Sequence, residues 1–201
     1  KIYRSFDWGY NKPFSCGWWA VDYEGVAYRI IELYGCTQTP NEGVKWSNKE
    51  QFDKIAEIER EHPWLKGRKI IGIADPAIWD AETGESIADT AAKHQVFFGK
   101  GDHQRIPGWM QCHYRLAFDE NGYPMFYVFN NCKGFIRTIP GLMYSETRPE
   151  DLDTDGEDHS DSLKLSDLTV RGKVAHSRTA KGADEDISDY HNEARDTEGD
   201  E

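Results

Sequence analysis

The feature that most constrains the fold is a set of three strand-like runs within the first 34 residues. Residues 2–7, 14–22 and 25–34 are rich in aromatic and β-branched side chains, which favour extended backbone in a sheet. The turn-like sequence Asp-Tyr-Glu-Gly separates the second run from the third. These three runs therefore predict an antiparallel meander.

A helix and a short buried strand follow the meander. Ser47 and Glu50 have the spacing of a capping box, and apolar residues recur at helical spacing between residues 52 and 58. Residues 69–74 (KIIGIA) form a short apolar run typical of a buried strand. Because a helix joins the two strands, we expect residues 69–74 to lie parallel to residues 2–7.

The rest of the chain alternates shorter segments. The sequence predicts strands over residues 96–98 and 124–129, a loop over 145–156, and helices over 85–93, 103–118, 131–139 and 158–170. Beyond residue 171 the chain is polar and charged, which is typical of disorder. We therefore expect an α/β domain over residues 1–170, with an acidic tail over 171–201. The order of the predicted strands and helices matches a ribonuclease H-like mixed sheet, although other mixed sheets would fit the same order.

Composition limits the class of protein. The net charge is −12, of which −7 falls in residues 181–201, so the remainder is only mildly acidic. An acidic chain does not attract nucleic acid through its own net charge. No run of eighteen apolar residues exists, so no membrane span is predicted. The four cysteines form no C-x-x-C pair, which favours reduced thiols over a zinc site. Because the chain starts at Lys1 rather than Met, we expect a neighbouring domain to be missing.

Two aspartates follow the predicted parallel strands. Asp7 ends the first run, and Asp75 follows residues 69–74. The carboxyl ends of parallel strands meet at one edge of a sheet, where α/β proteins usually place their sites. Two neighbouring carboxylates repel each other, and a bound divalent cation such as Mg²⁺ or Mn²⁺ removes that repulsion. The alternative is that each Asp only starts a turn or caps a helix.

A third acidic group lies near the end of the predicted domain. The stretch GEDHSDSLKL, residues 156–165, holds Glu157, Asp158, His159 and Asp161 at the start of a predicted helix. Asp161 is the strongest candidate ligand there, and the alternative is an acidic cap that complements the helix dipole. His159 could orient a ligand, carry a proton, or be an ordinary surface residue.

These segments together resemble a known family. FDWGY, then IADPA, then EDHSDSL resemble the C-terminal nuclease domain of the large terminase subunit of tailed bacteriophages. The stretches GDHQRIPGWMQCHYRLAF and YPMFYVFNNCKGFIRTIPGLMY are also similar to family segments. The resemblance covers about residues 1–165, and it is specific through the order and spacing of the motifs rather than through any one of them.

The resemblance implies a ribonuclease H-like fold and metal-dependent cleavage of double-stranded concatemeric DNA at the start and end of viral genome packaging. It also implies an N-terminal ATPase domain; no G-x-x-x-x-G-K-[ST] loop is present in this chain. The implied partners are double-stranded DNA, the small terminase subunit and the portal, without a membrane. The implied location is the host cytoplasm, transiently at the viral procapsid.

Carried over residue by residue, the catalytic and metal-binding acids are Asp7, Asp75 and Asp161. In the implied mechanism Asp7 bridges two Mg²⁺ or Mn²⁺ ions about 3.5–4 Å apart. The third motif departs from the family pattern, because one residue instead of two separates His159 from Asp161 and Leu165 replaces an aromatic residue. Since one residue rotates a helix by roughly 100°, Asp158 stays an alternative third ligand and full activity stays an open question.

The duplex needs cations outside the metal site. Phosphate contacts are expected from basic residues before and within the later helices, against the alternative of an ordinary solvated surface: Lys100, His103, Arg105, Lys133 and Arg137. Two rival functions remain at this stage. One is another ribonuclease H-like nuclease, such as a junction resolvase or transposase core, and the other is a catalytically inactive DNA-binding or docking module.

Overall fold

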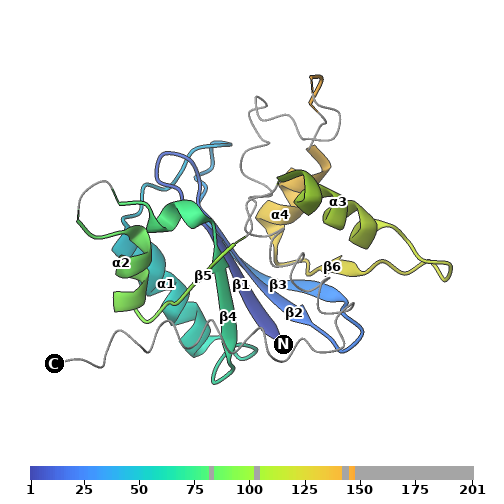
Figure 1. Cartoon of the computed structure of the whole chain (residues 1–201), viewed down its shortest axis with the longest axis horizontal. Helices are drawn as coiled ribbons and strands as arrows, with labels where there is room; N and C mark the ends of the chain where they lie inside the picture. Colours follow the sequence, from blue (N-terminus) through green and yellow to red (C-terminus); the bar gives the residue numbers. More distant parts are fainter. Residues whose placement is uncertain (82–83, 102–104, 142–144, 148–201) are drawn as a thin grey trace.

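The computed structural model describes residues 1–81, 84–101, 105–141 and 145–147. Six strands form one mixed sheet in the order β5-β4-β1-β2-β3-β6 (Figure 1). The strands are β1 (Ile2–Asp7), β2 (Ser15–Val21), β3 (Ala27–Tyr34), β4 (Ile70–Ala74), β5 (Gly99–Lys100) and β6 (Phe126–Val128). The helices are α1 (Asn48–Glu61), η1 (Pro76–Trp79), α2 (Ile87–Lys93), α3 (Arg105–Leu116), α4 (Lys133–Thr138) and η2 (Ile139–Gly141).

The predicted meander is confirmed. β1 pairs antiparallel with β2 from Ile2↔Ala20 to Asp7↔Ser15, and β2 pairs antiparallel with β3. An irregularity between Trp18 and Trp19 shifts the second register. The expected parallel pairing is also confirmed, because β1 and β4 run side by side from Ile2↔Ile70 to Phe6↔Ala74.

Helix α1 begins at the predicted capping box. Ser47 is its N-cap, and the capping box forms in both directions, because Ser47 Oγ accepts from the Glu50 backbone and Glu50 accepts from the Ser47 backbone. Phe52 and Ile55 are fully buried on the helix face that meets the sheet. The helix thus forms where its local cap and its apolar stripe agree.

The predicted strand over residues 96–98 is wrong. The edge strand β5 lies at Gly99–Lys100 and pairs with Ile73 and Ala74 of β4. The Phe97 carbonyl instead accepts a hydrogen bond from the Arg4 guanidinium at 2.5 Å. A long side chain from β1 therefore bonds the carbonyl of Phe97, and the ladder to β4 starts only two residues later.

Helix α3 includes Pro107, which the sequence pattern treats as an interruption. Proline is tolerated in the first turn of a helix, because the N–H groups there have no intrahelical acceptor. Within the described residues the helix spans Arg105–Leu116, so it ends two residues before the predicted end at residue 118. The predicted strand 124–129 and helix 131–139 are present as β6 and α4.

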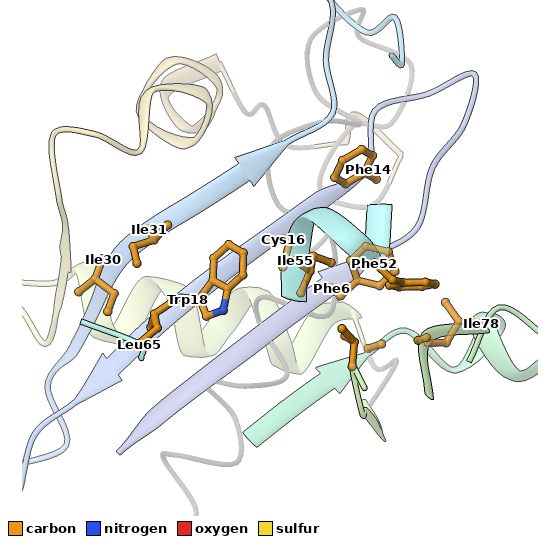
Figure 2. Packing of buried hydrophobic residues seen from close by; sticks show 13 residues of the cluster. Phe6, Phe14, Cys16, Trp18, Ile30, Ile31, Phe52, Ile55, Leu65 and Ile78 are labelled. Atoms are coloured by element: carbon orange, nitrogen blue, oxygen red, sulfur yellow. The ribbon is translucent and has the colours of Figure 1, made fainter. Parts of the chain in front are cut away.

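Each face of the sheet has its own apolar core. Helices α1 and α2 lie on one face, and α3 and α4 lie on the other (Figure 1). The first core includes Phe6, Phe14, Trp18, Phe52 and Ile55, and Figure 2 shows how they pack between α1 and the strands. The second core includes Trp19, Ile73, Cys112, Phe126 and Phe135. Burial on both faces explains why residues 69–74 are almost continuously apolar.

The predicted helix 158–170 and the tail 171–201 lie outside the described residues, as does most of the predicted loop 145–156. Within the described residues, no helix is long and apolar enough to cross a membrane.

Candidate active site

The two predicted acids lie at the ends of neighbouring strands. Asp7 is the last residue of β1, and Asp75 follows the last residue of β4. The pair Phe6↔Ala74 comes just before them, and the Asp75 backbone N–H donates to the Phe6 carbonyl at 3.4 Å. The two aspartates therefore continue the parallel register by one step.

Both side chains leave the sheet on the same face. Successive side chains of a strand alternate between faces. Phe6 and Ala74 belong to the core beneath α1, whereas Ile73 belongs to the core beneath α4. Asp7 and Asp75, one residue further along each strand, therefore project toward the face that carries α3 and α4.

Asp75 also has a structural task. It is the N-cap of η1, and its Oδ1 accepts a hydrogen bond from the Ala77 backbone N–H at 2.8 Å. From the sequence, Asp75 could be either a helix cap or a metal ligand. A carboxylate has two oxygens with about four acceptor positions, so one cap bond is compatible with metal binding.

The loop after Asp7 is held tightly by α1. Gln51, which is fully buried, donates from Nε2 to the Gly9 carbonyl at 2.9 Å and to the Trp46 carbonyl at 3.0 Å. Trp8 Nε1 donates to Asn48 Oδ1 at 2.7 Å. A Cβ atom on Gly9 would lie 2.4 Å from the Lys12 carbonyl oxygen, so only glycine fits there. These contacts fix the backbone that follows Asp7.

The third predicted ligand belongs to the part of the chain that the structure does not describe. Asp161, its alternative Asp158, and His159 all lie outside the described residues. Within the part of the chain that the structure describes, no three His, Cys, Asp or Glu side chains come together as a metal site. The described portion of the site is thus a pair of carboxylates, and oxygen ligands of this kind suit Mg²⁺ or Mn²⁺.

The predicted phosphate contacts fall in several places. Lys100 is exposed on β5, where it pairs with Ala74, the residue before Asp75. Its Nζ lies 5.6 Å from the centre of the Trp79 ring. Lys133 and Arg137 are exposed on α4. Arg105 begins α3, and His103 lies outside the described residues.

Helix α4 is fixed beside the carboxylate edge by Glu32. The Gly134 and Phe135 backbone N–H groups donate to the Glu32 carboxylate at 2.6 and 3.0 Å. Tyr34, the last residue of β3, packs against Gly134. Because Tyr34 pairs with Ser15 and Ser15 pairs with Asp7, α4 starts at the same edge as Asp7, which brings Lys133 toward it.

Two further lysines at this edge were missed from the sequence. Lys12 lies in the loop after Asp7, and Lys45 lies in the segment that precedes α1. The two loops are joined, because the Gly43 N–H donates to the Asn11 carbonyl at 2.8 Å. The short distance along the chain from Asp7 to Lys12 could have indicated Lys12 from the sequence. Lys45 could not be found in this way, because the pairing of its loop with the loop of Lys12 depends on tertiary structure.

The cations at this edge differ from those on the helices. On the α1 and α2 surface, Lys49, Lys54 and Lys93 each pair with a carboxylate. Among the described residues, Lys12, Lys45, Lys100 and Lys133 form no ion pair. Their charge is therefore available to an anion near Asp7 and Asp75.

No protein-family model matches the sequence, and no curated protein matches it either. Solved structures do match. The large terminase of a thermophilic bacteriophage is similar with a TM-score of 0.63 at 17% identity, over 87% of this chain and 40% of that chain. The g2p large terminase nuclease domain of bacteriophage SPP1, solved with bound Mn, has a TM-score of 0.53 at 18% identity, over 90% of this chain and 87% of that chain.

The P22 large terminase nuclease domain is similar with a TM-score of 0.50 at 15% identity, over 88% of this chain and 81% of that domain. The chain spans about 40% of the length of the thermophilic phage's large terminase but most of the length of the two isolated nuclease domains. Over most of its length, the chain therefore has the ribonuclease H-like fold of large terminase nuclease domains.

Proposed function

We propose that this chain is a metal-dependent endonuclease that cuts double-stranded concatemeric DNA during the packaging of a tailed bacteriophage genome. The observation that carries the proposal is the placement of Asp7 and Asp75 at the ends of the adjacent parallel strands β1 and β4, on one face of the sheet. The match to terminase nuclease domains supports it, as does the manganese bound in the SPP1 domain.

Asp7 and Asp75 would hold Mg²⁺ or Mn²⁺, with Asp161 or Asp158 as the third ligand. Such ions, when bound, lower the pKa of an attacking water and stabilise the leaving oxygen of a phosphodiester. The chain's own contribution is to keep two carboxylates in register. Gln51 and Asn48 hold the loop behind Asp7, and η1 fixes Asp75 through its cap bond.

The lysines around this edge would bind the phosphate backbone of the duplex. Contacts to phosphate carry little sequence information, which suits an enzyme that cuts at many sites. Lys12 and Lys45 join Lys100 and Lys133 in this role. His103, Arg105 and Arg137 remain predicted contacts, to be tested separately.

The wider assembly is part of the proposal. Because the chain spans about 40% of the large terminase of the thermophilic phage, we propose that an ATPase domain accompanies it in the whole protein. The small terminase subunit and the portal would be its partners, in the host cytoplasm and at the procapsid. Residues 1–170 would form the nuclease domain and residues 171–201 its acidic tail.

Plasmid cleavage in Mn²⁺ and in Mg²⁺ tests the function. Asp7→Asn and Asp75→Asn should each lower the rate at least a hundredfold, because each removes a ligand charge while keeping its shape. Asp161→Asn beside Asp158→Asn identifies the third ligand. Asp80→Asn is the matched control, because Asp80 is exposed just after η1 and outside the proposed site.

Calorimetric titration with Mn²⁺ separates the nuclease from an inactive docking module. The wild type should bind Mn²⁺, and Asp7→Asn should weaken the binding. Branched duplexes and RNA–DNA hybrids in the same cleavage assay separate a terminase nuclease from a junction resolvase or transposase core. A folded wild-type protein that neither binds Mn²⁺ nor cuts any of these substrates would refute the proposal.

A further inference from the structure

A small pocket lies at the end of the sheet opposite the two aspartates. Its volume is about 190 Å³, and its lining includes Arg4, Glu59, Arg68, Ile70, Gln95 and Phe97. Ile70 is the first residue of β4, whereas Asp75 follows the last one. The pocket therefore belongs to a part of the molecule that the proposed nuclease site does not use.

A buried guanidinium forms one wall of this pocket. Arg4 is only 3% exposed, and it donates to Glu59 Oε1 at 2.6 Å and to the Phe97 carbonyl at 2.5 Å. Its Nε–H has no hydrogen-bond acceptor among the described residues. Glu59 balances the charge of Arg4, so the unsatisfied Nε–H group adds only its own dipole to the wall of the pocket.

Glu59, the one acidic residue among the described lining residues, is already paired with Arg4. Glu59 Oε1 accepts from both Arg4 and the Trp18 indole N–H, the latter at 2.8 Å. Arg68, the second guanidinium of the lining, is exposed and forms no ion pair with any described residue. Because Glu59 pairs with Arg4, the charge that remains among the described lining residues is the positive charge of Arg68.

The turn between α1 and β4 adds to this charge. Lys66 and Lys69 flank Arg68, are exposed, and likewise lack a carboxylate partner in the described ranges. Lys1 precedes β1 beside Lys69, because Ile2 pairs with Ile70. By contrast, Arg60 on α1 pairs with Glu61 at 2.8 Å. Among the described residues, cations without a carboxylate partner are thus concentrated in the turn that contributes Gly67 and Arg68 to the pocket.

We propose that this pocket is a binding site for a phosphate group, held by Arg68 and the Gln95 amide against the Arg4 wall. A volume of about 190 Å³ holds several waters at about 30 Å³ each, which is enough for a phosphate with part of its hydration shell. The source is either free phosphate or the backbone of a nucleic acid. The inference does not rest on the proposed nuclease function.

The test uses the full chain in EDTA, so that no metal occupies the carboxylate edge. Sodium phosphate is titrated at constant ionic strength against chloride, with binding followed by the amide NMR signals of Gly67, Arg68 and Gln95. Arg68→Gln should weaken phosphate binding on the order of tenfold, the effect of one hydrogen bond to a charged group. The control is Arg60→Gln, an exposed arginine on the preceding helix that is already paired.

Binding of a labelled DNA duplex in EDTA, measured by anisotropy, identifies the source. The probe is compared between the wild type and Lys66→Gln/Arg68→Gln/Lys69→Gln. Weaker duplex binding by this variant would assign the site to the nucleic-acid backbone. Unchanged duplex binding together with phosphate binding that needs Arg68 would assign it to free phosphate. If neither probe depends on these three residues while the variants remain folded, the inference is wrong.

Discussion

At the residue scale, Asp75 caps η1 and is also a proposed metal ligand, two roles that sequence patterns treat as alternatives. Its Oδ1 accepts the capping hydrogen bond from the Ala77 N–H, and its position beside Asp7 supports the proposal that it also binds a metal ion. The cap needs only an acceptor oxygen, whereas metal binding needs the negative charge. Asparagine retains the first property and lacks the second.

Two substitutions at this position should therefore separate stability from cleavage. Asp75→Asn should keep the free energy of unfolding close to the wild-type value, because its amide oxygen can still accept from Ala77. Asp75→Ala should lose about 1 kcal/mol, as is usual when a cap acceptor is removed. Both variants should fail to cleave plasmid. Urea unfolding beside the cleavage assay measures this, and a fully active Asp75→Asn would remove Asp75 from the metal site.

At the element scale, two helices begin with the same device. Ser47 and Glu50 form a capping box on α1, and Ser86 and Asp89 form one on α2. The hydrogen bonds from Ser47 lower the pKa of Glu50, and those from Ser86 lower the pKa of Asp89. A carboxylate that is stabilised in the folded state makes stability depend on pH in the acid range.

The sign of this dependence follows from the lowered pKa values. The contribution is complete above the ordinary pKa of a Glu or Asp side chain, about 4, and is lost as the pH falls through the lower folded-state pKa. Glu50→Gln/Asp89→Asn should therefore flatten the acid limb of a curve of stability against pH. Ser47→Ala/Ser86→Ala should flatten it as well, because it removes the hydrogen-bond partners. Urea unfolding between about pH 5 and pH 2 measures the slope, and an unchanged slope in both variants would contradict the prediction.

The attachment of α4 to β3 gives a second prediction at this scale. Glu32 accepts from two backbone N–H groups at the start of α4, and Arg29, which is buried, lies 3.8 Å from its carboxylate. Glu32→Ala removes all three interactions and leaves the Arg29 charge without this counterion. We expect a loss of about 3 kcal/mol in the free energy of unfolding. Glu120→Ala, at an exposed turn residue, is the control, and equal losses in urea unfolding would contradict the argument.

The elements that the sequence predicted well are those set by local signals. The α1 cap at Ser47 and the aromatic and β-branched runs of the first strands need no distant partner to be recognised. The edge strand was misplaced because the Phe97 carbonyl bonds to Arg4, which lies 93 residues away in the chain. In the same way, the placement of Asp7 and Asp75 at the ends of neighbouring strands was predicted from the sequence, whereas the hydrogen bond from Gln51 to Gly9 depends on tertiary packing.

At the scale of the whole molecule, cations are distributed unevenly. The net charge of −12 does not describe the surface that a duplex would meet. Lysines on α1 and α2 are paired with carboxylates, whereas the described lysines around the Asp7 edge have no ion-pair partner. A paired lysine must give up its carboxylate before it can bind a phosphate. An unpaired lysine can bind a phosphate directly, and this binding releases counterions from the DNA.

This difference predicts which lysines control the salt dependence of DNA binding. Each phosphate contact contributes about 0.9 to the slope of log affinity against log salt. Lys100→Gln/Lys133→Gln should therefore lower the slope by about 1.8 and weaken binding at low salt. Lys49→Gln/Lys54→Gln removes the same charge from paired lysines on α1 and should leave the slope almost unchanged. Anisotropy of a labelled duplex in Ca²⁺, from about 50 to 200 mM salt, measures both. If the two double variants lose the same slope, DNA responds to total charge, and the edge beside Asp7 has no special part in binding it.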